Sequence, residues 1–171
     1  MSDQISKEEA FQTFEKDKEL RGYLAGAIDC DGAIVAQFVR RQDYILGWQI
    51  RCTVQLSQSI RRKKYIEEIC EKVGLGYIRT RKNMCDWIVA DTKQVKKLLE
   101  VLKENLKMKK DQAVLVLEII EKLSSVQNDP QRFLELANLV DDVSILNDSI
   151  SSKRIHTSSS IRDFFLEEGF I

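Results

Sequence analysis

Two aspartates that close a helical segment are the residues in this sequence best suited to chemistry. Asp29 and Asp31 stand in the last turn of a helix predicted over residues 18–31, and Gly32 follows them. The helix dipole disfavours carboxylates at this end. A divalent cation would reverse that penalty, and Mg²⁺ typically binds one or two carboxylates together with water and phosphate oxygens. The pattern therefore indicates either a metal site or a simple helix stop with surface acids.

Small residues recur along one side of the same predicted helix. Gly22, Gly26 and Cys30 stand four residues apart, with Ala25 beside them. A stripe of small side chains lets two helix backbones approach closely. Each glycine inside a helix costs roughly 1 kcal/mol relative to alanine. Tight packing against an identical helix is one way to offset that cost.

The segments behind this helix are predicted to form an antiparallel sheet. Residues 48–57 alternate apolar and polar side chains, as a half-buried strand does. Further strands are predicted over 33–41, 76–81 and 86–90, with turns through 42–47 and through Lys82 and Asn83. The polar faces of these strands are rich in two residue types: Gln37, Arg41, Gln49, Arg51, Gln55, Arg79 and Arg81. Arginine pairs with guanine and glutamine with adenine in the major groove, so the faces favour DNA readout. A polar sheet that packs on a partner protein is the alternative.

The remaining segments are predicted to be helices. They cover residues 61–73 with Gly74 as the stop, 92–104 with Thr92 as the cap, 110–123, a helix opened by Asp129 and Pro130, and 161–168. The order predicts an α+β domain of the αββαββα type with additional C-terminal helices and a four-stranded antiparallel sheet. We expect a single domain of 171 residues, with an N-terminal extension (1–17), a core (18–123) and C-terminal helices (124–171).

Composition narrows the class of protein. The chain has 27 basic and 27 acidic residues, and a neutral total alone argues against nucleic-acid binding. However, residues 33–110 hold 18 of the basic and 8 of the acidic residues, so one face can be strongly basic. The four cysteines form no CxxC pair and there is one histidine, which makes a zinc site a poor expectation. We also expect no membrane span and no signal or transit peptide.

Residues 24–32 read LAGAIDCDG and resemble the motif for which the LAGLIDADG endonuclease family is named. Seven of the nine letters match, with Ala27 in place of leucine and Cys30 in place of alanine. Residues 74–79, 106–109 and 146–149 also resemble the small homodimeric, intron-encoded members of this family. Only one copy of the motif is present, and single-motif members dimerise. The resemblance therefore implies a LAGLIDADG endonuclease-like fold and a homodimer with Gly22, Ala25, Gly26 and Asp29 at its interface.

The resemblance also assigns roles in catalysis. Asp31 matches the essential metal-binding acid, and the backbone carbonyl of Cys30 matches a second ligand. Gln58 matches a polar residue that positions water, Arg62 a basic residue near the active site, and Lys109 a lysine that polarises water or stabilises charge. The expected cofactor is Mg²⁺, with Mn²⁺ able to substitute and Ca²⁺ expected to bind without supporting cleavage. A metal-activated water would hydrolyse each strand of the DNA, one strand per subunit.

The expected target is a pseudo-palindromic double-stranded DNA of roughly 20 base pairs, read by the two sheets of a two-fold dimer. Base contacts are expected from Gln37, Val39, Arg41, Tyr44, Gln49, Arg51, Thr53, Gln55, Tyr77, Arg79, Arg81, Asp86 and Ile88. Such an enzyme would initiate intron homing. It would work in a chloroplast or mitochondrion that encodes it, or in a prokaryotic cytoplasm.

Three alternatives differ from this interpretation. An RNA-binding intron maturase on the same fold would bind intron RNA, with cleavage weakened or lost. A transcription regulator related to the family would normally carry an additional helix-turn-helix domain. A helical interaction protein whose motif match is accidental would have no salt-dependent affinity for DNA.

Overall fold

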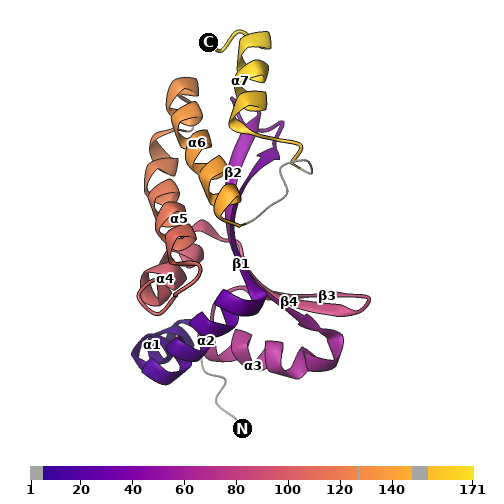
Figure 1. Cartoon of the computed structure of the whole chain (residues 1–171), viewed down its shortest axis with the longest axis vertical. Coiled ribbons are helices and arrows are strands. Elements are labelled where there is room, and N and C mark those ends of the chain that lie inside the picture. Colours follow the sequence, from indigo (N-terminus) through magenta and orange to yellow (C-terminus); the bar gives the residue numbers. More distant parts are fainter. Residues whose placement is uncertain (1–5, 127, 148–153) are drawn as a thin grey trace. The chain divides into compact units, whose positions relative to one another are not determined.

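The computed structural model describes residues 6–126, 128–147 and 154–171 (Figure 1). The elements follow the predicted order: α1 (Lys7–Lys16), α2 (Lys18–Asp31), β1 (Gly32–Arg40), β2 (Trp48–Ser59), the 3₁₀ turn η1 (Ile60–Arg62), α3 (Lys63–Val73), β3 (Tyr77–Arg81), β4 (Met84–Val89), α4 (Thr92–Leu102), α5 (Lys110–Lys122), the 3₁₀ turn η2 (Leu123–Ser125), α6 (Pro130–Leu146) and α7 (Ser158–Glu167). The expected α+β class is confirmed. Among the described residues no helix is both long enough and apolar enough to cross a membrane.

The chain forms two compact units. The first comprises Met1–Ala33 and Thr53–Lys110, and the second comprises Ile34–Cys52 and Asp111–Ile171. The first unit holds α1 to α4, β3, β4 and the second half of β2. The second unit holds most of β1, the first part of β2 and nearly all of the C-terminal helices. The single-domain boundaries expected at residues 17 and 123 stay a prediction, and the two units are described separately below.

The four strands form one sheet in the order β1-β2-β4-β3. In the first unit β4 lies between β2 and β3 and pairs antiparallel with both. Trp87 of β4 pairs with Leu56 on one side and Ile78 on the other, and its ring is fully buried. Its indole N–H donates to the carbonyl of Leu75 over 2.8 Å, so the largest core side chain is also fully bonded. The opposite face carries the row Ser57, Asp86 and Arg79.

The junction between α2 and β1 brings the end of the helix close to the sheet. Asp17 caps α2 by accepting a hydrogen bond from the backbone N–H of Leu20 over 2.9 Å. At the other end, a Cβ on Gly32 would lie 2.9 Å from the carbonyl oxygen of Gln55 and 2.7 Å from Cα of Ile28. Only glycine therefore allows the helix end and β2 to approach this closely. The carboxylates of the last turn are thus held beside the sheet.

Several local predictions are confirmed. Gly74 ends α3 with φ +70°, and Asp129 with Pro130 opens α6. Ser6 and Glu9 form a capping box at the start of α1. In β2 the apolar side chains are buried and the polar ones between them are half-buried, as the alternation predicts. These features succeed because each depends on one or two residues and on local backbone geometry.

Other boundaries differ from the predictions. Asp91, rather than Thr92, caps α4, because the Asp91 carboxylate accepts from the backbone N–H of Gln94 over 3.0 Å. The helix expected from residue 61 begins as the 3₁₀ turn η1. Arg41 lies in the loop after β1 rather than in the strand. The last helix begins at Ser158, since Thr157 accepts from the N–H of Ser160 and supplies a cap.

The second unit packs the β1–β2 hairpin with α5, α6 and α7 around an aromatic core. The rings of Phe38, Phe133 and Phe165 are buried, with centroids 6.4 Å apart for the first pair and 5.6 Å for the second. Figure 1 shows α6 and α7 beside this hairpin. The C-terminal helices therefore cover the apolar side of the strands within this unit.

Candidate active site

A chain of two hydrogen bonds joins Arg62, Gln58 and Asp31. The Gln58 amide Nε2 donates to Oδ2 of Asp31 over 2.7 Å, and Nη1 of Arg62 donates to Oε1 of Gln58 over 2.7 Å. A guanidinium can only donate, so Arg62 fixes the amide oxygen toward itself and turns the amide N–H toward the carboxylate. Gln58 is buried while Asp31 is exposed. These hydrogen bonds therefore hold the exposed carboxylate of Asp31 in one orientation.

Lys109 reaches the end of the same helix through Asp29. The Asp29 carboxylate accepts the backbone N–H of Lys107 over 2.8 Å and that of Lys109 over 2.9 Å. The Lys109 ammonium donates to the backbone carbonyl of Asp29, two residues before Asp31. Since Asp29 is buried, it acts as a tie between α2 and the segment before α5 and has no free oxygen facing solvent. Asp29 is therefore a hydrogen-bonding group at the helix end.

All four residues expected to be catalytic therefore lie in the first unit. Asp31, Gln58 and Arg62 are joined directly, and Lys109 is held at the last turn of the helix that carries Asp31.

The pKa of Tyr65 is raised above its ordinary value. The main cause is burial, followed by a hydrogen bond with Tyr23 and the charges of Tyr23 and Asp31. The nearby phenol thus stays protonated, and it is no candidate for a general base near neutral pH.

The donor set at the helix end suits a hard cation that keeps much of its water. Asp31 and Cys30 are both exposed. Among the described residues, no group of three or more His, Cys, Asp or Glu side chains is arranged to hold a metal ion. One carboxylate and one backbone carbonyl per chain would leave most positions to water and phosphate, which is the usual coordination of Mg²⁺. They would not make a closed structural zinc site.

A buried carboxylate organises two arginines on the open face of the sheet. Asp86 is fully buried and accepts from Ser57 Oγ over 2.7 Å, from Arg81 Nη2 over 2.8 Å and from Arg79 Nε and Nη2 over 3.2 and 3.1 Å. Gln55 Nε2 in turn donates to Ser57 Oγ over 2.7 Å. Burial on its own would raise the pKa of Asp86, but the hydrogen bonds from Ser57, Arg81 and Arg79 outweigh it and lower the pKa. The carboxylate is therefore ionised at neutral pH.

The residues expected to contact bases differ in their exposure. Gln37, Tyr77, Arg79 and Arg81 are exposed, whereas Val39, Arg41, Tyr44, Gln49, Arg51, Thr53 and Gln55 are partly exposed. Asp86 and Ile88 are buried. Base contacts by these two residues stay a prediction, and the side chains of Ser57, Arg79 and Arg81 surround Asp86. Asp86 orients Arg79 and Arg81.

Two residues with a role in this surface were missed by the sequence analysis. Ser57 links Gln55 to Asp86, although its place on the polar side of the alternation was visible. Asp43 pairs with Arg41 through two hydrogen bonds of 2.9 and 2.7 Å. Hydrogen bonds from Arg41 and from its own backbone lower the pKa of Asp43 to about 2. The sequence signal for this pair was the spacing of Arg41 and Asp43, two residues apart at a predicted turn.

One side of α2 carries no neighbour from its own unit. A Cβ added at Gly22 or at Gly26 would meet no atom within 4 Å. Ala25 and Asp29, also expected at the dimer interface, are buried against the chain's own residues. The open stripe of α2 therefore consists of Gly22, Gly26 and Cys30.

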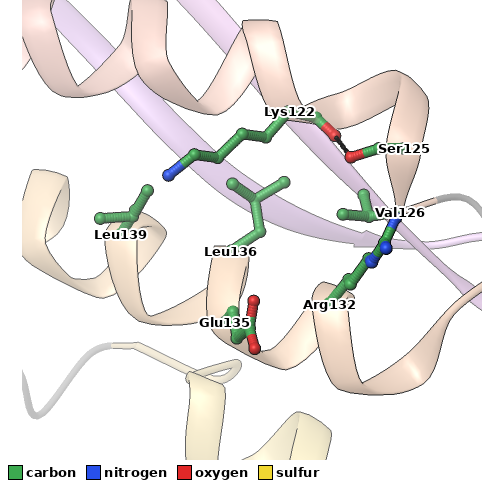
Figure 2. Close-up of a pocket in the computed structure, with 7 residues that line it drawn as sticks. All are labelled: Lys122, Ser125, Val126, Arg132, Glu135, Leu136 and Leu139. Carbon is green, nitrogen blue, oxygen red and sulfur yellow. Dashed lines mark hydrogen bonds between the residues drawn. The ribbon is translucent and has the colours of Figure 1, made fainter.

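The second unit has a hollow whose lining includes none of the site residues described above. It is lined by Lys122, Ser125, Val126, Arg132, Glu135, Leu136 and Leu139 of α5, η2 and α6 (Figure 2). None of its lining residues is among those expected in catalysis or DNA contact. Its cations are already paired, Lys122 with Glu118 and Arg132 with Asp129.

Comparison with known proteins identifies the family. The model of the LAGLIDADG endonuclease family matches residues 24–120, which begin with the motif and end in α5. The DNA endonuclease I-CreI of Chlamydomonas reinhardtii is 39% identical over 145 residues, covering 85% of this chain and 88% of that protein. The DNA endonuclease I-CvuI of Chlorella vulgaris is 35% identical over 150 residues, covering 87% and 91%. The chain belongs to the LAGLIDADG endonuclease family.

Solved structures agree with this assignment. The crystal structure of I-CvuI in complex with the I-CreI target matches with a TM-score of 0.82 at 34% identity, covering 88% of this chain and 95% of that one. The archaeal intron-encoded homing endonuclease I-Vdi141I, complexed with DNA, matches with a TM-score of 0.75 at 19% identity, covering 88% and 97%. The second likeness supports the fold alone. This chain covers 95% and 97% of the two solved chains, so the likeness extends over nearly their whole length.

Proposed function

We propose that this protein is a site-specific homing endonuclease that hydrolyses both strands of a double-stranded DNA target. The observation that carries the proposal is the hydrogen-bonded chain from Arg62 through Gln58 to Asp31, at the end of the motif helix. An arrangement that holds one exposed carboxylate in a fixed orientation is suited to metal-assisted phosphodiester hydrolysis. Membership of an endonuclease family supports the same activity.

The residues of this chain would act as follows. Asp31 and the carbonyl of Cys30 would hold Mg²⁺, which when bound activates water and stabilises the leaving oxygen of the scissile phosphate. Gln58 keeps the Asp31 carboxylate turned toward the ligand position. The charges of Arg62 and Lys109 favour an anionic phosphate at the helix end. We propose Mn²⁺ as a substitute and Ca²⁺ as an ion that binds without supporting cleavage.

The open face of the sheet would read the DNA in the major groove. Arg79 and Arg81 are held by Asp86, so part of the cost of ordering two long side chains is met before DNA binds. Gln55, linked to the same carboxylate through Ser57, is ordered in the same way. Exposed Gln37 and Tyr77 would add contacts. Preordered donors of this type favour sequence-specific over general binding.

We propose a homodimer that forms through the open stripe of α2. The space beside Gly22 and Gly26 allows the backbone of a second α2 to approach. Dimerisation would bring two copies of Asp31 together, and one site would cut each strand of a pseudo-palindromic target. The algal origin of both endonuclease relatives supports an organelle as the place of action.

The test uses purified protein, Mg²⁺ and a randomised pool of duplex DNA, from which cleaved ends are sequenced. The control is Asp31→Asn, which keeps the shape of the side chain and removes its charge. We expect one pseudo-palindromic sequence of roughly 20 base pairs to be cut by wild type and not by the variant. A folded wild-type protein that cuts nothing would refute the endonuclease, and binding of intron RNA in the same preparation would favour the maturase.

A further inference from the structure

The guanidinium of Arg40, at the end of β1, contacts an aromatic ring of α7 and one of β2. Cζ of Arg40 lies 4.1 Å from the ring centroid of Phe164 and 5.0 Å from that of Trp48. The two rings contact each other edge to face, with centroids 5.9 Å apart. Arg40 is exposed overall, yet its guanidinium contacts both rings. All three residues belong to the second unit.

The same guanidinium closes the loop between β1 and β2. Nη1 of Arg40 donates to the carbonyl of Gly47 over 3.1 Å, and this carbonyl also accepts the backbone N–H of Arg41 over 2.9 Å. Gly47 has φ +70°, and a Cβ there would collide with the guanidinium, 3.1 Å from Cζ. The backbone conformation therefore favours glycine, and a larger residue there would displace the Arg40 guanidinium from its place.

The loop that is closed in this way carries two of the expected base contacts. Arg41 pairs with Asp43 through two hydrogen bonds, and its Cζ lies 5.4 Å from the ring centroid of Tyr44. The Gly47 N–H donates to the Tyr44 carbonyl over 2.8 Å. The positions of Arg41 and Tyr44 thus depend on the backbone that the Arg40 guanidinium holds.

We propose that Arg40, held by Phe164 of α7 and by Trp48, is a positioning residue that sets the readout of DNA by the loop at residues 41–47. The inference rests on the proposed endonuclease function. A hairpin loop is normally among the least protected parts of a fold. Here the C-terminal helix supplies an aromatic surface that reduces its motion. Because the guanidinium contacts two rings and donates to the carbonyl of Gly47, Arg40 acts through the loop rather than by a phosphate contact.

The first test does not require DNA. Hydrogen exchange of the amides in residues 41–47 is measured in the full-length protein for wild type, Arg40→Met, Phe164→Leu and the control Arg162→Met, which changes an exposed arginine of α7. Loss of two ring contacts and a hydrogen bond is expected to speed exchange in this loop about tenfold in Arg40→Met. A smaller increase is expected in Phe164→Leu and none in the control. Unchanged exchange in both variants would overturn the proposal.

The second test compares base preferences at each position of the target selected by wild type. Arg40→Met is expected to lose preference at the same base pairs as Arg41→Ala, with other positions unchanged and the salt dependence of binding retained. A uniform loss of affinity with a shallower salt dependence would overturn the proposal, because Arg40 would then be a phosphate contact. If wild type selects no DNA, the endonuclease proposal fails and the readout role fails with it. The exchange result still tests the contact between Arg40 and the loop.

Discussion

Replacing Asp86 with asparagine should weaken both the fold and the discrimination of bases. The side chain of Asp86 is fully buried, whereas those of Arg79 and Arg81 are 49% and 52% exposed. Solvent can therefore rehydrate the arginines, and each lost ion pair should cost no more than about 1 kcal/mol. Asparagine keeps the shape and one acceptor, so no cavity forms. We expect the free energy of unfolding to fall by about 1–2 kcal/mol.

The stability difference between wild type and Asp86→Asn should depend on pH. Because the pKa of Asp86 is lowered in the folded state, its ionised form stabilises the fold above the pKa of the unfolded chain, about 4. That contribution is lost as the pH falls through the lowered folded value. The stability difference between wild type and Asp86→Asn should therefore be full near pH 7 and shrink below about pH 4.

Urea denaturation at several pH values measures the difference, with Asp142→Asn as the control because Asp142 is exposed on α6. The base-preference profile of the variant is measured in parallel. Freed arginines should still bind phosphate, so overall affinity should change less than discrimination at the positions read by Arg79 and Arg81. If Asp86→Asn were as stable as wild type at pH 7 and kept its base preferences, the reasoning about this carboxylate would be refuted.

Three further outcomes are expected. Asp29→Ala leaves the backbone N–H groups of Lys107 and Lys109 without their acceptor and should lower the free energy of unfolding by about 2–4 kcal/mol, measured by urea denaturation. Gln58→Ala removes the group that orients the carboxylate of Asp31, which we propose binds the metal, and should lower the cleavage rate about 10- to 100-fold in single-turnover assays, with DNA affinity unchanged. Gly26→Leu fills the open side of α2 and should convert the dimer to a folded monomer in analytical ultracentrifugation, whereas a dimer of unchanged affinity would contradict the proposed interface.

The sequence allowed much of the fold to be predicted, since local rules decide it. Alternation in residues 48–57 reflects a strand with one buried face, and Gly74 and Asp129 mark helix ends through single contacts. Thr92 was wrong as a cap because Asp91 competes for the same amide and holds it. Such a choice between adjacent capping residues depends on backbone angles that the residue types do not reveal.

The candidate site was less accessible to prediction where it depends on contacts across the chain. The family resemblance assigned Asp86 a base contact, which stays a prediction. The sequence could not show that Asp86 is buried or that Ser57 and two arginines surround its carboxylate. In the same way, the pairing of Asp29 with amides near residue 108 joins segments almost 80 positions apart. Long-range pairing of this kind depends on the tertiary structure, which local periodicity does not contain.

The two carboxylates of the motif helix illustrate how one segment divides structural and chemical roles. Asp29 and Asp31 are two residues apart, so on a helix they face nearly opposite directions. Asp29 turns inward and its charge is used on backbone amides, whereas Asp31 turns outward and is held only by Gln58. The inward carboxylate offsets the unfavourable dipole at the helix end by taking two donors. Among the described residues the outward carboxylate accepts one hydrogen bond, from Gln58, and a bound cation would supply further compensation.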